Sequence, residues 1–120
     1  MIQPTPTVTV TEASQRLASA DQRTPLLVDV REPSEFGLLR VPGAVLMPLS
    51  TFTARFEELP GGRPLLLMCA VGGRSARATE FLVANGYPES FNIAGGITAW
   101  NAAGLPVRTG PVEPGEGDLA

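Results

Sequence analysis

The fold of this chain is indicated first by residues 64–75, which are Pro64-Leu65-Leu66-Leu67-Met68-Cys69-Ala70-Val71-Gly72-Gly73-Arg74-Ser75. The run up to Met68 is the most apolar strand candidate in the sequence, and unbroken runs of this kind are typical of parallel strands covered by helices on both faces. Gly72 and Gly73 allow a tight turn, after which Ser75 is expected to begin a helix. The stretch therefore predicts a central strand, a short loop and a helix.

Strands and helices alternate on both sides of this stretch. Further strands are expected at residues 8–10, 26–30, 44–47 and 90–93. Helices are expected at 11–20, with Thr11 as the N-cap, and at 50–59, 75–84 and 97–103, with a helical turn at 34–39. Such alternation is typical of a parallel sheet with right-handed crossovers. We therefore predict a three-layer α/β domain over residues 1–108.

Residues 109–120 differ in composition from the rest of the chain, because proline, glycine and acidic residues dominate them. A segment of this kind buries too little apolar surface to order itself, so a disordered tail or linker is expected there. The chain has 120 residues, of which 43% are hydrophobic, and this is enough for one domain with its own core.

Composition excludes several classes of function. A net charge of -3 offers no basic field for nucleic acid. The chain has no histidine and one cysteine, so metal sites, cofactors held by such ligands, a Cys-His dyad and an internal disulfide are not expected. The amino terminus lacks the charge and apolar run of a signal peptide, and no run approaches the ~20 apolar residues of a membrane helix. A cytoplasmic location is therefore expected.

Cys69 is the candidate nucleophile, because it follows the central strand at the sheet edge where α/β proteins bind ligands. The loop from Ala70 through Val71, Gly72 and Gly73 can turn its N–H groups inward as an anion-binding nest, and a helix N-terminus adds positive potential. These groups and Arg74 would favour the thiolate over a thiol whose ordinary pKa is about 8.5. A lone buried cysteine is the alternative, but the following Gly-Gly-Arg-Ser favours a reactive thiol.

The sequence resembles the rhodanese-like domain family over residues 8–107. Four blocks carry the resemblance: residues 29–36 (DVREPSEF), 41–44 (VPGA) with Pro48-Leu49, 69–75 (CAVGGRS), and 92–97 (NIAGGI) with Trp100 and residues 104–107 (GLPV). The resemblance implies a five-stranded parallel sheet flanked by helices and a cysteine persulfide intermediate. It also implies transfer of sulfane sulfur from a small anionic donor such as thiosulfate, or from a protein persulfide donor, to a thiophilic acceptor.

The resemblance also assigns residues to roles. Cys69 is the nucleophile, and Ala70, Val71, Gly72, Gly73, Arg74 and Ser75 form the loop that holds the donor. Arg74 is expected to anchor the loop by pairing with a carboxylate, for which Glu32 is the candidate. Two positions depart from the family pattern. Ala70 stands where arginine is common in members that use thiosulfate, and Arg40 stands where histidine is usual. Arg40 could replace the missing charge if it points toward the loop.

Two other residues are weighed as loop support or donor attraction. Asp29, at a strand end near Arg31, is expected to be a structural carboxylate that fixes the following turn. Arg77 either attracts an anionic donor or is a solvated charge on the helix.

Three functions remain open at this point. The first is a sulfurtransferase that works by thiolate attack. The second is a phosphatase or arsenate reductase, but those enzymes use a loop one residue longer than the four residues between Cys69 and Arg74. The third is a persulfide carrier or interaction module that accepts sulfur from a protein partner.

Overall fold

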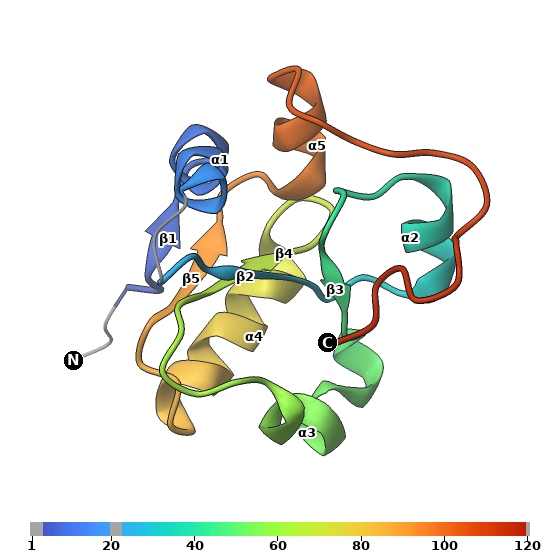
Figure 1. The fold of residues 1–120 in the computed structure, drawn as a ribbon. Coiled ribbons are helices and arrows are strands. Elements are labelled where there is room, and N and C mark those ends of the chain that lie inside the picture. Colours follow the sequence, from blue (N-terminus) through green and yellow to red (C-terminus); the bar gives the residue numbers. More distant parts are fainter. Residues whose placement is uncertain (1–3, 20–22, 120) are drawn as a thin grey trace.

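The computed structural model describes residues 4–19 and 23–119, which form a five-stranded parallel sheet with helices on both faces (Figure 1). The strands are β1 Thr7–Val8, β2 Leu26–Asp29, β3 Val45–Leu46, β4 Leu65–Met68 and β5 Ser90–Ile93. Their spatial order is β1-β5-β4-β2-β3, and every neighbouring pair is parallel. The predicted α/β class and the central position of β4 are confirmed.

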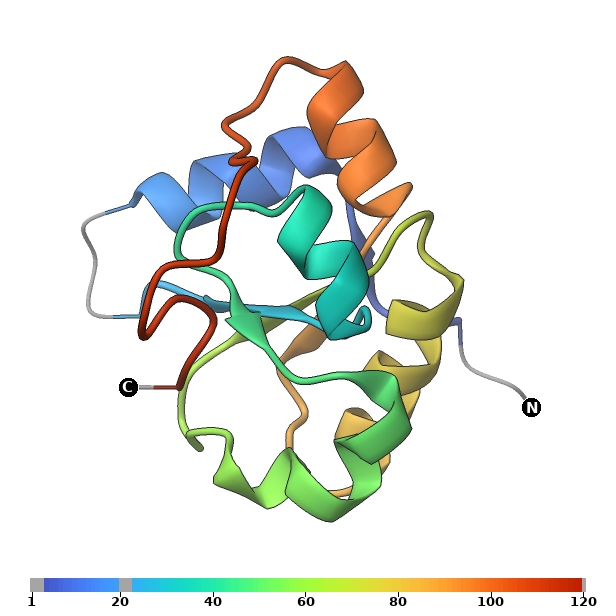
Figure 2. The same ribbon diagram turned by 90° about the vertical axis from the view of Figure 1, so that its right-hand side faces the viewer.

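The helices alternate with these strands. They are α1 Val10–Ala18, α2 Pro33–Leu38, α3 Phe52–Arg55, α4 Gly73–Ala84 and α5 Gly96–Ala102, with 3-10 turns η1 Leu49–Thr51 and η2 Phe56–Glu58 on either side of α3. In Figure 2, α1, α2 and α5 lie on one side of the sheet, and α3 and α4 lie on the other. The three predicted layers are therefore present.

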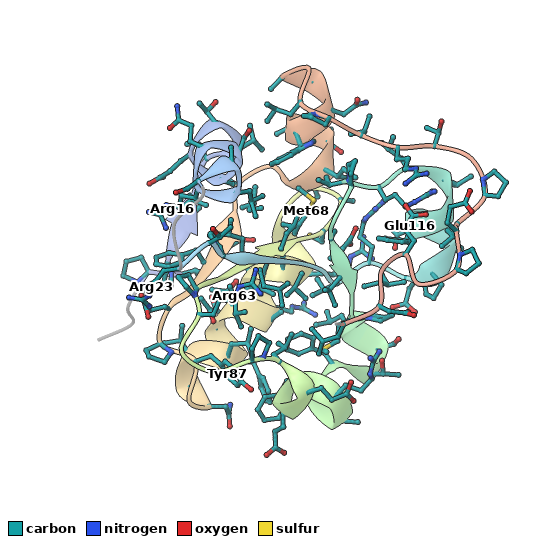
Figure 3. All side chains as sticks on the ribbon, in the orientation of Figure 1. Arg16, Arg23, Arg63, Met68, Tyr87 and Glu116 are labelled. Atoms are coloured by element: carbon teal, nitrogen blue, oxygen red, sulfur yellow. The ribbon has the colours of Figure 1, made fainter. Side chains whose placement is uncertain are left out.

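The central strand divides its side chains between two cores. Leu66 and Met68 belong to a cluster with Trp100 of α5, whereas Leu65 and Leu67 belong to the cluster that includes Leu82 of α4. Figure 3 labels Met68 at the end of β4, beneath α5. Because successive side chains of a strand point to opposite faces, the next residue, Cys69, joins the α4 side. This alternation decides which helix the cysteine faces.

The helices predicted at 11–20 and 50–59 differ in the structure. The first begins at Val10 because the Thr9 side chain, rather than Thr11, caps it by accepting the Glu12 N–H at 3.1 Å. The predicted end at Ala20 lies outside the described residues. The helix expected at 50–59 is broken into η1, α3 and η2. Phe52 and Leu59 are buried there, so packing determines this segment more than helical propensity does.

Residues 109–119 lie against the domain, which differs from the expected disordered tail or linker. The Arg40 guanidinium, fully buried, donates to the Gly110 carbonyl at 3.0 Å and the Pro111 carbonyl at 3.1 Å, and it pairs with Glu116. The Leu46 N–H of the edge strand donates to the Gly117 carbonyl at 2.8 Å. Figure 3 places Glu116 beside α2. Polar contacts with a buried arginine hold a segment that has little apolar surface of its own.

Candidate active site

Cys69 lies directly after β4, and only 1% of its surface is exposed. Its side chain packs on the α4 side of the sheet with Ala78 and Leu82. The following residues 70–72 form the loop that leads into α4. A thiol held here is in a shielded environment, so its charge state depends on the groups that contact the sulfur.

Two polar groups contact the sulfur. The Gly72 N–H donates to Sγ of Cys69 at 3.1 Å, and the Ser75 hydroxyl lies 3.2 Å from the same atom. Burial raises the pKa of the Cys69 thiol, but hydrogen bonds from the Ser75 hydroxyl and from the N–H groups of Ser75, Gly72 and Val71 outweigh it. The net effect is a pKa below the ordinary value, and this favours the thiolate.

Gly72 allows the loop to close on the sulfur. Its φ of +110° lies in the left-handed region, where glycine is strongly favoured, and it is the N-cap of α4. A β-carbon there would lie 3.5 Å from the Gly95 nitrogen. The helix begins at Gly73, two residues before the predicted start, so the N–H groups of its first turn face the loop.

The start of α5 holds the loop from its outer side. The Ile97 N–H donates to the Cys69 carbonyl at 2.9 Å, and the Thr98 N–H donates to the Ala70 carbonyl at 3.1 Å. Gly96 permits this approach, since a β-carbon would overlap the Cys69 carbonyl oxygen. Because α5 binds the carbonyl groups of Cys69 and Ala70 on the outer side, the N–H groups of the loop can face the sulfur.

Arg74 anchors the loop, but the expected partner is wrong. Its guanidinium binds Glu35 of α2 through two hydrogen bonds of 2.7 and 2.8 Å, not Glu32. Glu32 caps α2 in a reciprocal capping box with Glu35 and accepts the Ser50 hydroxyl at 3.0 Å. Because the Glu32 side chain is turned onto the first turn of α2 as its cap, the carboxylate three residues further along is the one that meets Arg74.

Arg40 does not replace the charge that Ala70 lacks. Its guanidinium is buried under the C-terminal segment and bound there, so it does not point toward the loop. Asp29 contacts the Arg31 side chain at 2.8 to 3.1 Å and accepts the Arg31 backbone N–H at 3.0 Å. The Arg31 guanidinium also donates to the Leu39 carbonyl at 2.6 Å. These contacts fit the structural role predicted for Asp29.

An open hollow of about 340 Å³ lies over the sulfur and is lined by Cys69, Val71, Gly73, Arg74 and Arg77. Arg77 is exposed on α4 and lines this hollow, so a donor anion in it would meet that side chain. A larger hollow of about 520 Å³, whose lining includes Thr51 and Leu119, does not contain the cysteine. The smaller hollow is therefore the candidate active site.

The sequence reading missed Asn92. This residue of β5 is 7% exposed, and its Oδ1 lies 2.6 Å from the Ser75 hydroxyl oxygen, which itself contacts Cys69. The sequence feature that could have identified it is a polar amide in a short strand that is expected to be covered by helices. A buried amide needs a polar partner, and here the partner is the Ser75 hydroxyl at the start of α4.

Two further properties concern the described part of the chain. None of its helices has the length and apolar character needed to span a bilayer. Within residues 4–19 and 23–119, histidine, cysteine and acidic side chains do not gather into a group that could hold a metal ion.

Comparison with known proteins gives one consistent result. The model of the Rhodanese-like domain family matches residues 9–103. A sulfurtransferase of Allochromatium vinosum is 39% identical over 94 residues, which cover 78% of this chain and 86% of that protein. The thiosulfate sulfurtransferase GlpE of Vibrio cholerae is 32% identical over 91 residues, or 76% and 86% of the two chains.

Solved structures agree on the fold. The crystal structure of a rhodanese-related protein from Thermoplasma volcanium superposes with a TM-score of 0.78 at 26% identity and covers 86% of this chain and 97% of that one. A rhodanese-like domain protein of Staphylococcus aureus gives a TM-score of 0.72 at 30% identity, covering 79% and 90%.

Proposed function

The chain belongs to the rhodanese-like domain family, and we propose that it is a sulfurtransferase that carries sulfane sulfur on Cys69. The observation that carries the proposal is the pair of polar groups on the sulfur, the Gly72 N–H at 3.1 Å and the Ser75 hydroxyl at 3.2 Å, both of which can donate to a thiolate. A thiolate stabilised in this way attacks without a general base, which suits a chain that has no histidine. A cytoplasmic location, where the single thiol stays reduced, is part of the proposal.

The first half-reaction loads the cysteine. The Cys69 thiolate attacks the outer sulfur of thiosulfate, a new S–S bond forms, and the sulfur–sulfur bond of the donor breaks so that sulfite leaves with the bonding electron pair. The enzyme becomes a Cys69 persulfide with the same single negative charge. The N–H groups of the loop and the N-terminus of α4 face this charge, and they stabilise it in the same way as they stabilise the thiolate.

The second half-reaction removes the outer sulfur from the Cys69 persulfide. A thiophilic nucleophile such as cyanide attacks the outer sulfur, the S–S bond breaks toward Cys69, and the thiolate is restored. Because one cysteine serves both steps, the donor product leaves before the acceptor reacts, and ping-pong kinetics are expected.

Intact mass spectrometry tests the proposal. The full chain is incubated with thiosulfate or with a low-molecular-weight persulfide and weighed without reductant, and a gain of one sulfur atom is expected. Cyanide should then remove this gain and release thiocyanate. The Cys69→Ser variant is the matched control, because it keeps the size and fold but lacks the thiol. If no donor adds sulfur, or if the variant gains it equally, the proposal is wrong.

A protein persulfide donor is a second candidate substrate, and one observation favours it. Arg40 is bound under the C-terminal segment and Arg74 is bound to Glu35, so Arg77 is the remaining cation on the hollow. A site with so little free charge would bind a small dianion weakly, whereas a protein donor adds contact surface. The test compares loading by a cysteine desulfurase and cysteine with loading by thiosulfate. Faster loading at micromolar desulfurase than at millimolar thiosulfate supports the carrier role.

A further inference from the structure

The Ser75 hydroxyl lies between two groups that can accept its single proton. Its oxygen is 2.6 Å from Oδ1 of Asn92 and 3.2 Å from Sγ of Cys69. Ser75 and Cys69 are at most 1% exposed and Asn92 is 7% exposed. Polar groups with so little exposed surface depend mainly on one another for their hydrogen bonds.

The direction of the hydrogen bonds among Cys69, Ser75 and Asn92 depends on the charge of the sulfur. When Cys69 is a thiol, its S–H can donate to Ser75 and the Ser75 hydroxyl can donate to Oδ1 of Asn92. When the sulfur is an anion it needs a donor, and the Ser75 proton is then required on the sulfur side. With the proton there, Oδ1 of Asn92 would face a hydroxyl oxygen that has no proton left to give. Two acceptors 2.6 Å apart repel each other, so one of them must change.

We infer that Asn92 is a positioning residue whose side-chain amide reverses the Ser75 hydroxyl when Cys69 ionises. Turning the amide by half a turn brings Nδ2 to the place of Oδ1, so that Nδ2–H donates to Ser75 and the Ser75 hydroxyl donates to the anionic sulfur. An asparagine side chain can serve as donor or acceptor from the same position. A carboxylate of the same shape would be an acceptor only.

The proton balance of this step is simple. The thiol proton leaves Cys69 for solvent through the open hollow above it, and Asn92 neither gains nor loses a proton. In a Cys69 persulfide the charge lies on the outer sulfur rather than on Sγ, so the reversal of the Ser75 hydroxyl belongs to the free thiolate. The amide therefore supports the neutral and the anionic forms of the site in turn.

Other charged groups also face the sulfur and must be held constant in a test. Arg74 and Arg77 of α4 line the hollow with Cys69, and Glu35 of α2 is bound to Arg74. Asp29, at the end of β2, is paired with Arg31. None of these residues bonds to Asn92 in the described part of the chain, so substitutions at position 92 leave their pairing intact.

The test measures the thiolate directly. The inference shares one premise with the proposed function, namely that Cys69 is the reacting thiol. Because it does not require sulfur transfer, no sulfur donor is present in the test. The rate of alkylation by iodoacetamide is measured against pH. In Asn92→Asp, which keeps the shape but cannot donate, we expect the alkylation midpoint to rise and the rate at pH 7 to fall by about tenfold. Asn101→Asp adds the same charge on the exposed face of α5 and should leave the profile unchanged.

The same substitution is then made without the hydroxyl. In Ser75→Ala, which has no proton to direct, the further change Asn92→Asp should shift the midpoint far less than it does in the native chain. Equal shifts with and without the hydroxyl would show that the new carboxylate acts by its charge alone, and an unchanged profile in Asn92→Asp would show that the amide has no role. Either result overturns the inference.

A second measurement starts from the native chain. In ¹⁵N-labelled protein, the side-chain NH₂ signals of Asn92 should move with pH at the same midpoint as alkylation. The Ser75→Ala variant is the control, in which this movement should be absent. Signals that stay fixed while Cys69 ionises overturn the inference. If both tests give the expected results but the native chain never gains sulfur, the proposed function fails while this inference stands.

Discussion

The guanidinium of Arg74 and the carboxylate of Glu35 form a two-pronged ion pair, with both nitrogen–oxygen distances between 2.7 and 2.8 Å. The pair joins the first turn of α4, which carries the active loop, to α2. The same carboxylate accepts the Glu32 N–H at 3.1 Å and thereby closes the capping box of α2. The Glu35 side chain therefore fixes both the start of α2 and the position of α4, so these two helices should move together.

Removing the charge of Glu35 should slow sulfur loading more than it destabilises the fold. Glu35→Gln keeps a side chain that completes the capping box but loses the ion pair with Arg74. Because both partners are about one-third exposed, we expect a loss of only about 0.5–1 kcal/mol in the free energy of unfolding. The rate of persulfide formation should fall several-fold, since the loop loses its anchor.

The matched control is Glu12→Gln, which removes an ion pair with Arg16 on α1, away from the loop. Its effect on stability should be of similar size, and its loading rate should equal that of the native chain. Stopped-flow loading and urea unfolding measure the two quantities. Equal loading rates in both variants would mean that the pair is structural only.

Acid should weaken the fold through two carboxylates. Hydrogen bonds from Arg74 lower the pKa of Glu35 from 4.5 to about 2, and hydrogen bonds from Arg40 lower the pKa of Glu116 to about 2. Because these groups hold their protons less tightly in the folded than in the unfolded chain, their stabilisation is complete above about pH 5 and is lost as the pH falls toward 2. Urea unfolding at a series of pH values should show this decline, and it should be shallower in the double variant Glu35→Gln, Glu116→Gln. An unchanged slope would contradict the assignment.

Gly96→Ala should disrupt the active loop. Its φ of +56° is left-handed, and an added β-carbon would overlap the Cys69 carbonyl oxygen and lie 2.7 Å from the carbonyl carbon of Ala70. We expect a marked loss of stability and slower alkylation of Cys69. Gly104→Ala is the control, because Gly104 has a φ of +74° but no atom within 4 Å of an added β-carbon. It should cost about 1–2 kcal/mol for the backbone alone and leave alkylation unchanged. Similar alkylation rates in the two variants would show that the close approach of α5 is not needed.

Removing residues 109–120 should destabilise the domain. Arg40 is fully buried and depends on this segment for its carboxylate and two carbonyl partners. Truncation removes these partners but also opens the guanidinium to solvent, so the loss should be smaller than the roughly 3–5 kcal/mol of a charge left buried and unpaired. Denaturant unfolding of the truncated chain should show this loss. Truncation combined with Arg40→Met, which removes the buried charge, should recover part of the loss. If truncation changes nothing, the contacts of the segment are incidental.

The sequence allowed local features to be predicted, but not long-range pairs. β5 was predicted with its correct ends, because Ser90 and Ile93 are bounded by turn residues and the run between them is short. The partner of Arg74 was missed because Glu32 and Glu35 are equally near in sequence, and only the direction of α2 decides which of them faces α4.

The same limit applies to Arg40 and Glu116, which are 76 residues apart. Composition favoured disorder for residues 109–119, since composition measures apolar burial and does not register a segment held by one buried cation. Asn92 belongs to a block that resembles the family, but its contact with Ser75 depends on β5 lying beside β4, which no local pattern expresses.

Arg77 should determine how well the site accepts an anionic donor. Of the two cations on the hollow over Cys69, Arg74 is bound to Glu35, whereas Arg77 has no ion pair with any residue in the ranges 4–19 and 23–119. Arg77→Ala should therefore raise the KM for thiosulfate several-fold with little change in kcat, because a free charge near the entrance promotes binding more than the chemical step. Arg77→Lys should keep most of the affinity.

Arg55→Ala is the control, because it removes the same charge from the larger hollow of about 520 Å³, and it should behave as the native chain. Raising the salt concentration should weaken thiosulfate binding in the native chain and in Arg55→Ala, but much less in Arg77→Ala. A KM that is unchanged in Arg77→Ala would mean that the donor is held by the N–H groups of the loop alone.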